Sequence, residues 1–267
     1  MITSSSIVDT AASNAPASHE VALSVRNLSR SFDDIPAVRD LTFEVAKGTI
    51  TAFLGRNGAG KSTTIACLTG LLEPDEGVST LFGQPLSLPQ TRRKIGVLPQ
   101  DLGLFDELTV EENISIQAKL FGLDPTAIPE RTQWLLQKLL LTEEKGRRCG
   151  TLSSGTRKRA AFAVAVAHQP SFLFLDEPFE NVDPIGVIAM KDWMRHFVRQ
   201  QGGTILLTTH VLDTVEKLCD YGMILEKGRL VWQANLVQKH WEWQGFEVSS
   251  LEDLFLAIAN HKSASQA

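Results

Sequence analysis

A glycine-rich segment constrains the fold of this chain more than any other feature. Residues 55–62 read Gly-Arg-Asn-Gly-Ala-Gly-Lys-Ser, and they separate strand-forming residues at 50–54 from a predicted helix at 63–68. Glycines let successive backbone N–H groups point into the loop, and the helix start adds partial positive charge. Lys61 can reach the β- and γ-phosphates of a nucleotide, and the Ser62 hydroxyl can bind Mg²⁺. The segment predicts a nucleoside triphosphate site in an α/β fold; an ordinary helix-capping glycine turn is the alternative.

Composition and charge limit the domain count and the partners. The chain has 267 residues, of which 43% are hydrophobic, so it can form one sizeable α/β domain with a small appendage. A net charge of −5 without a block of Lys and Arg disfavours a nucleic-acid surface. Cys67, Cys149 and Cys219 have neither metal-ligand nor disulfide spacing, which predicts buried thiols in a reducing compartment. We find no signal-peptide pattern and no apolar stretch long enough to span a bilayer. We therefore expect a cytoplasmic protein.

The hydrophobic pattern predicts a parallel core with an antiparallel layer and a helical block. Alternating apolar and polar residues predict half-buried strands at 21–25 and 41–45. Continuous apolar runs at 172–175 and 204–208 predict strands that are covered on both faces of a parallel sheet. Further predicted elements are strands at 78–82 and 94–98 and a mainly helical stretch at about 110–168. Residues 1–20, rich in Ser and Ala, predict a flexible tail.

Four polar residues follow the predicted core strands. Asp176 and Glu177 end the buried strand at 172–175, and open α/β sheets bind ligands at the carboxyl ends of their strands. Asp176 can therefore orient Mg²⁺ while Glu177 positions or deprotonates the attacking water. His210 follows the next strand and can reach the γ-phosphate, and Gln100 can meet the metal or the water. A solvated acidic loop end and a structural histidine are the alternatives.

In this order the segments resemble the motif set of ATP-binding cassette ATPases over about residues 21–235. The resemblance is carried by Gly55 to Ser62, Gln100, Leu152 to Gly155, Leu173 to Pro178, Asp183 and His210. It implies a P-loop NTPase fold with a RecA-like parallel core, an antiparallel β subdomain and an inserted helical subdomain at about 101–168. A C-terminal helical extension at 236–267 would follow.

The resemblance also implies ligands and an assembly. Two cassettes, as a homodimer or with a related chain, close head to tail around two molecules of ATP with Mg²⁺. The implied ATP ligands are Phe32, Gly55, Arg56, Asn57, Gly58, Ala59, Gly60, Lys61, Ser62 and Thr63, and the implied metal ligands are Ser62, Gln100 and Asp176. Phe32 takes the place of the aromatic residue that stacks on adenine, with packing in the β layer as the alternative.

Residues 152–156 resemble the signature motif of this family. The Ser153 hydroxyl and the N–H groups of the following helix start form an anion site, whose ligand is by resemblance the γ-phosphate bound to a partner chain. A serine N-cap is the alternative. Ser153, Ser154 and Gly155 are the implied contacts. Ser154 replaces a usual glycine and Thr156 a usual glutamine, while Ser153 and Gly155 are retained, so we expect a working but slower site. Asp183 is implied to link the two active sites.

The implied function is the energising subunit of a membrane transporter, bound to separate integral permease subunits at the inner face of the cell membrane. Leu104 and Phe105 are candidates for the socket that receives a permease coupling helix, with core packing as the alternative. Residues 250–258 resemble the serine-capped terminal helix of ABC-2-type exporters, which favours export. A soluble cassette ATPase acting on nucleic acid or ribosomes is disfavoured by the single cassette and its short insertion. A regulator without turnover is disfavoured by Glu177 and His210.

Overall fold

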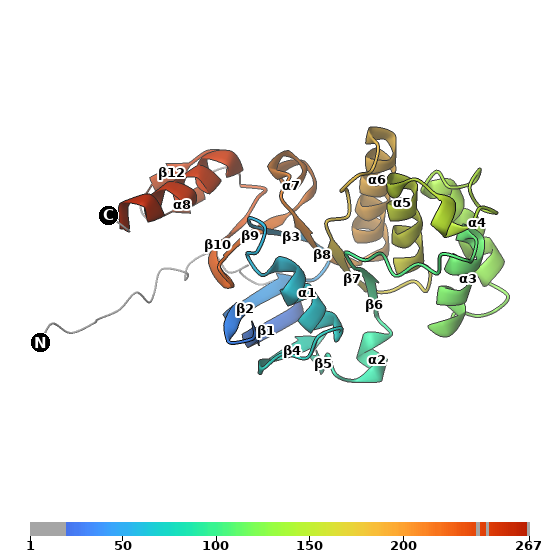
Figure 1. The fold of residues 1–267 in the computed structure, drawn as a ribbon, viewed down its shortest axis with the longest axis horizontal. Coiled ribbons are helices and arrows are strands. Elements are labelled where there is room, and N and C mark those ends of the chain that lie inside the picture. The colour runs from blue at the N-terminus through green and yellow to red at the C-terminus, as the bar shows by residue number, and fades with distance from the viewer. Residues whose placement is uncertain (1–19, 239–240, 244–245, 266–267) are drawn as a thin grey trace, which may run out of the picture.

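Two β-sheets and the helices around them form the core of the computed structural model, which describes residues 20–238, 241–243 and 246–265 (Figure 1). The larger sheet has the strand order β10-β9-β3-β8-β7-β6. Its neighbours from β9 to β6 pair in parallel, and β10 pairs antiparallel with β9 at one edge. The strands are β3 (Ile50–Leu54), β6 (Ile95–Leu98), β7 (Phe172–Asp176), β8 (Thr204–Thr209), β9 (Tyr221–Glu226) and β10 (Arg229–Asn235).

The smaller sheet is antiparallel and has the order β2-β1-β4-β5. Its strands are β1 (Val21–Phe32), β2 (Ile35–Ala46), β4 (Glu76–Leu81) and β5 (Gln84–Pro85). β1 and β2 are longer than the alternation at 21–25 and 41–45 predicted, because register shifts after Val25 and Leu28 interrupt the alternation while the pairing continues. Asp33 and Asp34, both with positive φ, make the two-residue turn between them.

The parallel sheet has a different partner on each face. Along β7, Phe172 and Phe174 pack with α1 (Lys61–Thr69) and the antiparallel sheet, whereas Leu173 and Leu175 pack with the helices on the opposite face. Period-two alternation of strand side chains places these neighbours on opposite faces. Both faces of β7 are therefore buried, which confirms the parallel α/β core predicted from its continuous apolar run.

The predicted helical stretch at about 110–168 consists of three helices, α3 (Val110–Leu120), α4 (Ile128–Lys138) and α5 (Ser154–Ala165), with a 3₁₀ turn at Cys149–Thr151. It lies between β6 and β7 in sequence, and Figure 1 shows its helices gathered on one side of the core beside α6. The remaining helices are α2 (Pro89–Arg92), α6 (Pro184–Gln201), α7 (Leu212–Leu218) and α8 (Leu251–Ser265). The fold class is thus the predicted one: a parallel core, an antiparallel sheet and an inserted helical block.

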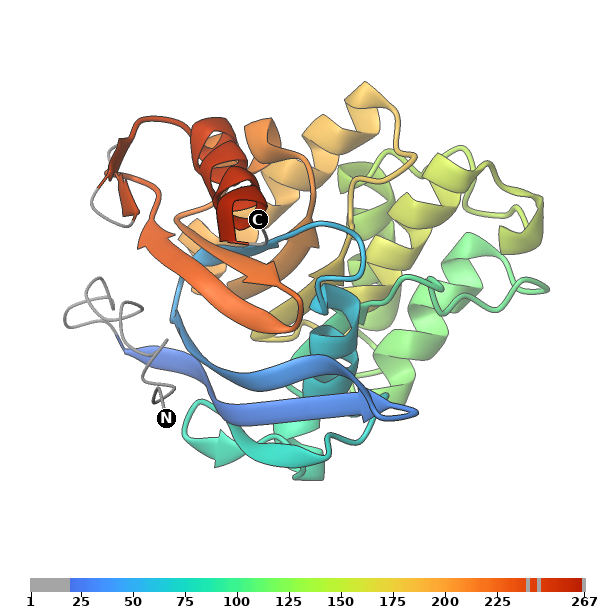
Figure 2. The ribbon, with the colours of Figure 1, turned by 60° about the vertical axis from the view of Figure 1, so that its left-hand side comes forward.

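The C-terminal segment differs from the helical extension predicted at 236–267, because it contains two short strands as well as a helix. Trp241–Trp243 and Phe246–Val248 form a small antiparallel hairpin, β11 and β12, before α8 begins. The predicted serine cap is present, because Ser250 Oγ accepts the Asp253 N–H at 3.0 Å. The Leu251 N–H donates to Glu216 Oε1 of α7 at 2.8 Å, and Figure 2 shows α8 lying above the core sheet.

Two further expectations bear on the core and on membranes. Cys67, Cys149 and Cys219 are free and buried, as predicted. In the part of the chain that the structure describes, no helix has the length and apolar content needed to cross a bilayer. Except for Glu20, the predicted tail at residues 1–20 lies outside the described residues, and the domain boundaries stay a prediction.

Candidate nucleotide site

The glycine-rich loop connects β3 to α1, as the sequence predicted. Gly60 has a φ of 101° and immediately precedes α1. A Cβ at this residue would collide with the carbonyl oxygen of Ala37, and a Cβ at Gly55 would lie 2.5 Å from that of Leu225. Only glycine can satisfy both restrictions, the left-handed φ and the close backbone approach. The loop is therefore held tightly between β2 and β9.

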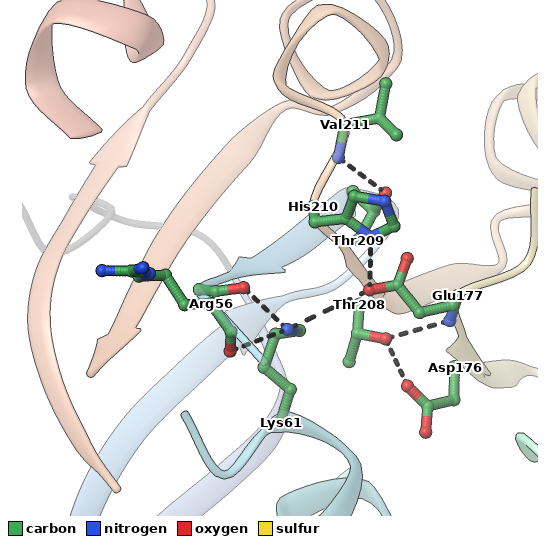
Figure 3. Close-up of polar contacts among 9 residues, drawn as sticks. Arg56, Lys61, Asp176, Glu177, Thr208, Thr209, His210 and Val211 are labelled. Carbon is green, nitrogen blue, oxygen red and sulfur yellow. Dashed lines mark hydrogen bonds and ion pairs between the residues drawn. The ribbon is translucent and has the colours of Figure 1, made fainter. Parts of the chain in front are cut away.

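Lys61 is buried at the start of α1 and its ammonium group is turned into the loop. Nζ donates to the Gly55 carbonyl at 2.7 Å and to the Arg56 carbonyl at 3.4 Å, and it lies 4.0 Å from Glu177 Oε1 (Figure 3). Burial lowers the pKa of Lys61, and the negative charges of Glu177 and Asp176 oppose that shift. The site thus holds one cation within reach of both loop and carboxylates.

Asp176 and Glu177 lie at the tip of β7, and a single hydroxyl of β8 connects them. Thr208 Oγ1 donates to Asp176 Oδ1 and accepts the backbone N–H of Glu177 at 3.0 Å. Glu177 has a φ of 44°, so the chain turns sharply there and its side chain projects in a different direction from that of Asp176. The two adjacent carboxylates therefore face different surroundings.

His210 follows β8 and meets Glu177 across the strand tips. Its Nδ1 lies 3.2 Å from Glu177 Oε1, and its side chain is more than half exposed, whereas that of Glu177 is mostly buried. Figure 3 shows the imidazole above the Glu177 carboxylate, with Lys61 on the other side of the same oxygen. One carboxylate oxygen thus lies between an imidazole and an ammonium group.

The structure brings most of the predicted residues together around one pocket of about 290 Å³. Its lining consists of Asn57, Gly58, Ala59, Gly60, Lys61, Ser62, Thr63, Gln100, Glu177, Glu180 and His210. Gly55 and Arg56 lie in the glycine-rich loop and Asp176 ends β7, but none of the three lines the pocket. Phe32 ends β1, is 46% exposed and lies beneath the Arg30 guanidinium, and it does not line the pocket either. Its role in adenine stacking stays a prediction.

A larger cavity, of about 550 Å³, lies at the amino-terminal ends of the core strands, opposite the candidate nucleotide pocket. Lys94, Ser171 and Gly203 are among its lining residues, and each precedes a core strand rather than following one. Ligands of open α/β sheets bind at the carboxyl ends of the strands, where the glycine loop and the two carboxylates lie. The candidate nucleotide site is therefore identified by the chemistry of its lining residues and not by the volume of the cavity.

The side chains near the loop suit a magnesium ion. Asp176 is 3% exposed, and its Oδ2 has no hydrogen-bond partner among the described residues. Ser62 is exposed at the start of α1, so a carboxylate and a hydroxyl oxygen are both available. Mg²⁺ prefers such oxygen ligands and takes the rest of its shell from water and substrate phosphates. This fits the observation that no described cluster of three His, Cys, Asp or Glu could hold a metal by itself.

The signature residues lie outside this pocket. Ser153 caps α5, since its Oγ accepts the Thr156 N–H at 3.3 Å. Gly155 is buried against residues 181–182, where a Cβ would lie 2.6 Å from the Asn181 carbonyl oxygen. Asp183 caps α6 through the Gly186 N–H at 2.9 Å, and this hydrogen bond chiefly lowers the pKa of Asp183. The start of α5 and the Asp183 loop therefore pack directly against each other.

Three residues near the site and one beneath the predicted socket escaped the sequence analysis. Thr208 tethers the carboxylates, and Glu180 lines the pocket. Lys158 of α5 is 5% exposed; burial lowers its pKa, and the charges of Glu180, Asp176 and Glu177 oppose that shift. Asn113 is buried beneath the predicted socket and holds the backbone of Phe105 through two hydrogen bonds. The polar end of the apolar run at 204–208 was the only sequence signal for any of them, and it pointed to Thr208.

A comparison with known families agrees with this geometry. Residues 38–180 match the family model described as ABC transporter, which is more than half of the chain. The chain belongs to the ABC transporter family. The match runs from β2 to the residues after β7 and so contains the glycine loop, the signature segment and both carboxylates.

Individual relatives of the ABC family are similar over most of the chain. The Nod factor export ATP-binding protein I of Rhizobium sp. (strain N33) is 36% identical over 86% of this chain and 77% of its own length. The ABC transporter ATP-binding protein NatA of Bacillus subtilis (strain 168) is 32% identical over 80% of this chain and 89% of its own length. A solved ATP-binding subunit of an ABC transporter has a TM-score of 0.81 at 31% identity, covering 89% of this chain and 99% of the other.

This ABC protein is therefore an ATPase that powers transport through membrane permeases. ATP binding is the shared property of these relatives, and the P-loop of the present chain has the residues for it. The alternative predicted from the sequence, a cassette acting on nucleic acid or ribosomes, finds no support among these relatives.

Proposed function

We propose that the pocket holds Mg·ATP and that Glu177 activates the water that attacks the γ-phosphate. The observation that supports this most directly is the convergence of Lys61, Ser62, Gln100, Glu177 and His210 on one pocket. Phosphoryl transfer needs positioning and charge stabilisation more than covalent chemistry, and these residues supply donors, a cation and a base.

Each side chain that lines the pocket would have its own role in binding or hydrolysis. The Lys61 ammonium exchanges its two loop carbonyls for phosphate oxygens, and the N–H groups of the loop and of the α1 start bind the rest of the triphosphate. Glu177 accepts a proton from the attacking water at its carboxylate, while His210 holds that carboxylate in position and can contact the γ-phosphate. Ser62, Asp176 and Gln100 would hold Mg²⁺, which neutralises the phosphate charge.

The signature segment needs an anion from a second cassette. Ser153 and Ser154 are exposed, and neither they nor Gly155 lines the pocket of their own chain. A helix start with a capping hydroxyl favours an anion, so a γ-phosphate of the facing cassette is the fitting ligand. The active assembly would be a homodimer or a heterodimer with a related chain. Asp183, whose loop packs next to the signature segment, would link the two active sites.

Export through permease subunits at the inner face of the cell membrane fits the surface of the helical block. Phe105 is 59% exposed, while Leu104 is partly buried against the core, so Phe105 is the more accessible of the two predicted socket residues. The relative in Rhizobium is named for Nod factor export, and a solved relative with 29% identity and a TM-score of 0.71, cbiO1 from Clostridium perfringens, is described as part of the ABC transporter complex cbiONQ.

The test is ATP-dependent dimerisation of a hydrolysis-deficient variant. Glu177→Gln should lower ATP turnover about a hundredfold or more and accumulate a dimer with Mg·ATP, read out by light scattering during size-exclusion chromatography. Adding Ser153→Ala should weaken this dimer without changing ATP binding by the monomer. A Glu177→Gln variant with normal turnover would remove this residue from the mechanism, and a dimer unaffected by Ser153→Ala would argue against the shared site.

A further inference from the structure

The hydroxyl of Ser153 has an unusual set of hydrogen-bond partners. Ser153 Oγ accepts the Thr156 N–H at 3.3 Å, and it lies 2.9 Å from the hydroxyl oxygen of the same Thr156. A threonine side chain in this position thus meets the serine from the following turn of α5. Glutamine, which is usual at this position in the family that the sequence resembles, has no hydroxyl to offer.

The Arg159 guanidinium favours one direction for the hydrogen bond between Ser153 and Thr156. Arg159 Nη2 donates to Thr156 Oγ1 at 3.4 Å, and a guanidinium group can only donate. One lone pair of the Thr156 oxygen is then occupied, and its own hydrogen is free to donate forward to Ser153 Oγ. In that arrangement Ser153 Oγ accepts twice, from the N–H and from the O–H of Thr156. Its remaining hydrogen has to point away from the helix.

Arg159 is held in place by contacts with two other segments. Its Nη1 donates to the Leu139 carbonyl at 3.0 Å and to the Leu140 carbonyl at 2.6 Å, just after α4. The side chain is 11% exposed, and its Nε lies 3.9 Å from Asp183 Oδ2. The guanidinium therefore connects the end of α4, the Asp183 loop and the start of α5.

We propose that Thr156 is a positioning residue for ATP hydrolysis: its hydroxyl donates to Ser153 Oγ and so aims the Ser153 hydroxyl hydrogen at the γ-phosphate of the facing cassette. The chain of donors runs from Arg159 through Thr156 to Ser153 and ends on an anion. Successive hydrogen bonds in one direction polarise one another, and a bond to an ionised acceptor is the strongest in such a chain. The inference rests on the proposed function, in which Ser153 contacts that phosphate.

The matched variants are Thr156→Val and Thr156→Ser in the full chain. Valine keeps the shape and the backbone N–H that donates to the capping Ser153 but removes the hydroxyl, whereas serine keeps the hydroxyl. We expect Thr156→Val to lower kcat about tenfold with an unchanged Kd of the monomer for ATP, and Thr156→Ser to stay within about twofold of the parent. In the Glu177→Gln background, Thr156→Val should weaken the Mg·ATP-dependent dimer by about the same factor as it lowers kcat.

Two further variants separate the outcomes. Thr142→Val changes an exposed threonine after α4 and should leave kcat unchanged. Ser153→Ala tests the proposed function itself: normal turnover in this variant would refute the shared site. Reduced turnover in Ser153→Ala together with parental kcat in Thr156→Val would overturn the positioning role alone. Equal losses in kcat and monomer ATP affinity for Thr156→Val, or no recovery in Thr156→Ser, would overturn it too, since either result indicates general damage to the fold.

Discussion

The hydroxyl of Thr208 on β8 hydrogen-bonds to Asp176 at the tip of β7. The parallel register pairs these two residues directly, and both are buried. The same hydroxyl accepts the Glu177 N–H, so one side chain fixes the Asp176 carboxylate, the proposed Mg²⁺ ligand, and the backbone of Glu177, the proposed base. The separation of their two proposed roles therefore depends on a residue of the neighbouring strand.

Thr208→Val should lower both stability and ATP turnover. Valine has nearly the same shape, but it leaves the Glu177 N–H and one Asp176 oxygen without a partner, which costs about 1–3 kcal/mol for each buried group. The free energy of unfolding in urea and the steady-state kcat both measure this. We expect kcat to fall more than the Kd for ATP changes, because the carboxylates act on the water and the metal.

Thr51→Val is the matched control for this change. Thr51 is fully buried on β3, and its hydroxyl makes no hydrogen bond to any described residue. Removing a buried hydroxyl without a partner should leave stability unchanged or raise it. Equal destabilisation by Thr51→Val and Thr208→Val would mean that the tether contributes nothing beyond packing.

Local sequence signals were enough to predict the glycine loop and the strand tips. The left-handed turn at Gly60 and the helix start at Lys61 lie next to each other in the sequence, and a continuous apolar run predicts β7. The contact between Thr208 and Asp176 depends on the strand register across 32 residues, which periodicity does not encode. The hairpin at Trp241–Trp243 was missed because three residues are too few to establish alternation.

Lys61→Ala should weaken ATP binding about ten- to hundredfold, because each charge-assisted hydrogen bond to a phosphate contributes about 1.5–3 kcal/mol. The Kd of the monomer for Mg·ATP, measured by titration calorimetry, reports the change. Lys47→Ala serves as control, since Lys47 is exposed, pairs with Glu20 and does not line the pocket. Unaltered binding by Lys61→Ala would contradict the assignment of the loop to the triphosphate.

Phe105→Asp should abolish association with the permease and spare ATP binding. Phe105 is exposed, and Asn113 anchors its backbone N–H at 2.9 Å and its carbonyl at 3.1 Å, so the side chain is presented from a fixed loop. Co-purification with membranes and the Kd for ATP are the two measurements. Leu120→Asp alters another exposed apolar residue, 69% exposed at the end of α3, and should retain association. Loss of ATP binding together with association in Phe105→Asp would indicate misfolding and remove the socket assignment.

His168 gives the fold a built-in sensitivity to acid. It is 9% exposed, its Nε2 lies 3.0 Å from the Ile95 carbonyl, and its ring stacks near Phe121 at 4.2 Å between centroids. Burial lowers the pKa of His168 from 6.5 to about 4, and the positive charge of Arg131 acts in the same direction. The Nε2–H donates to the Ile95 carbonyl in both protonation states, and this hydrogen bond opposes the shift. Protonation places a second hydrogen on the buried Nδ1, which has no hydrogen-bond partner among the described residues.

The sign of the pH dependence follows from these two pKa values. Between about pH 6.5 and pH 4 the unfolded chain binds a proton at His168 that the folded chain does not, so the free energy of unfolding falls as the pH drops through that window. The full loss of stability from this shift is about 3 kcal/mol, and above pH 6.5 the loss is absent.

His168→Gln should reduce the slope of the free energy of urea unfolding against pH in this window by the equivalent of about one proton, because glutamine stays neutral. His196→Gln, an exposed histidine on α6, should retain the parental acid loss. If the profile of His168→Gln keeps the parental slope, the acid sensitivity has its source elsewhere, since the only proton that this histidine can take up on unfolding has then been removed without consequence.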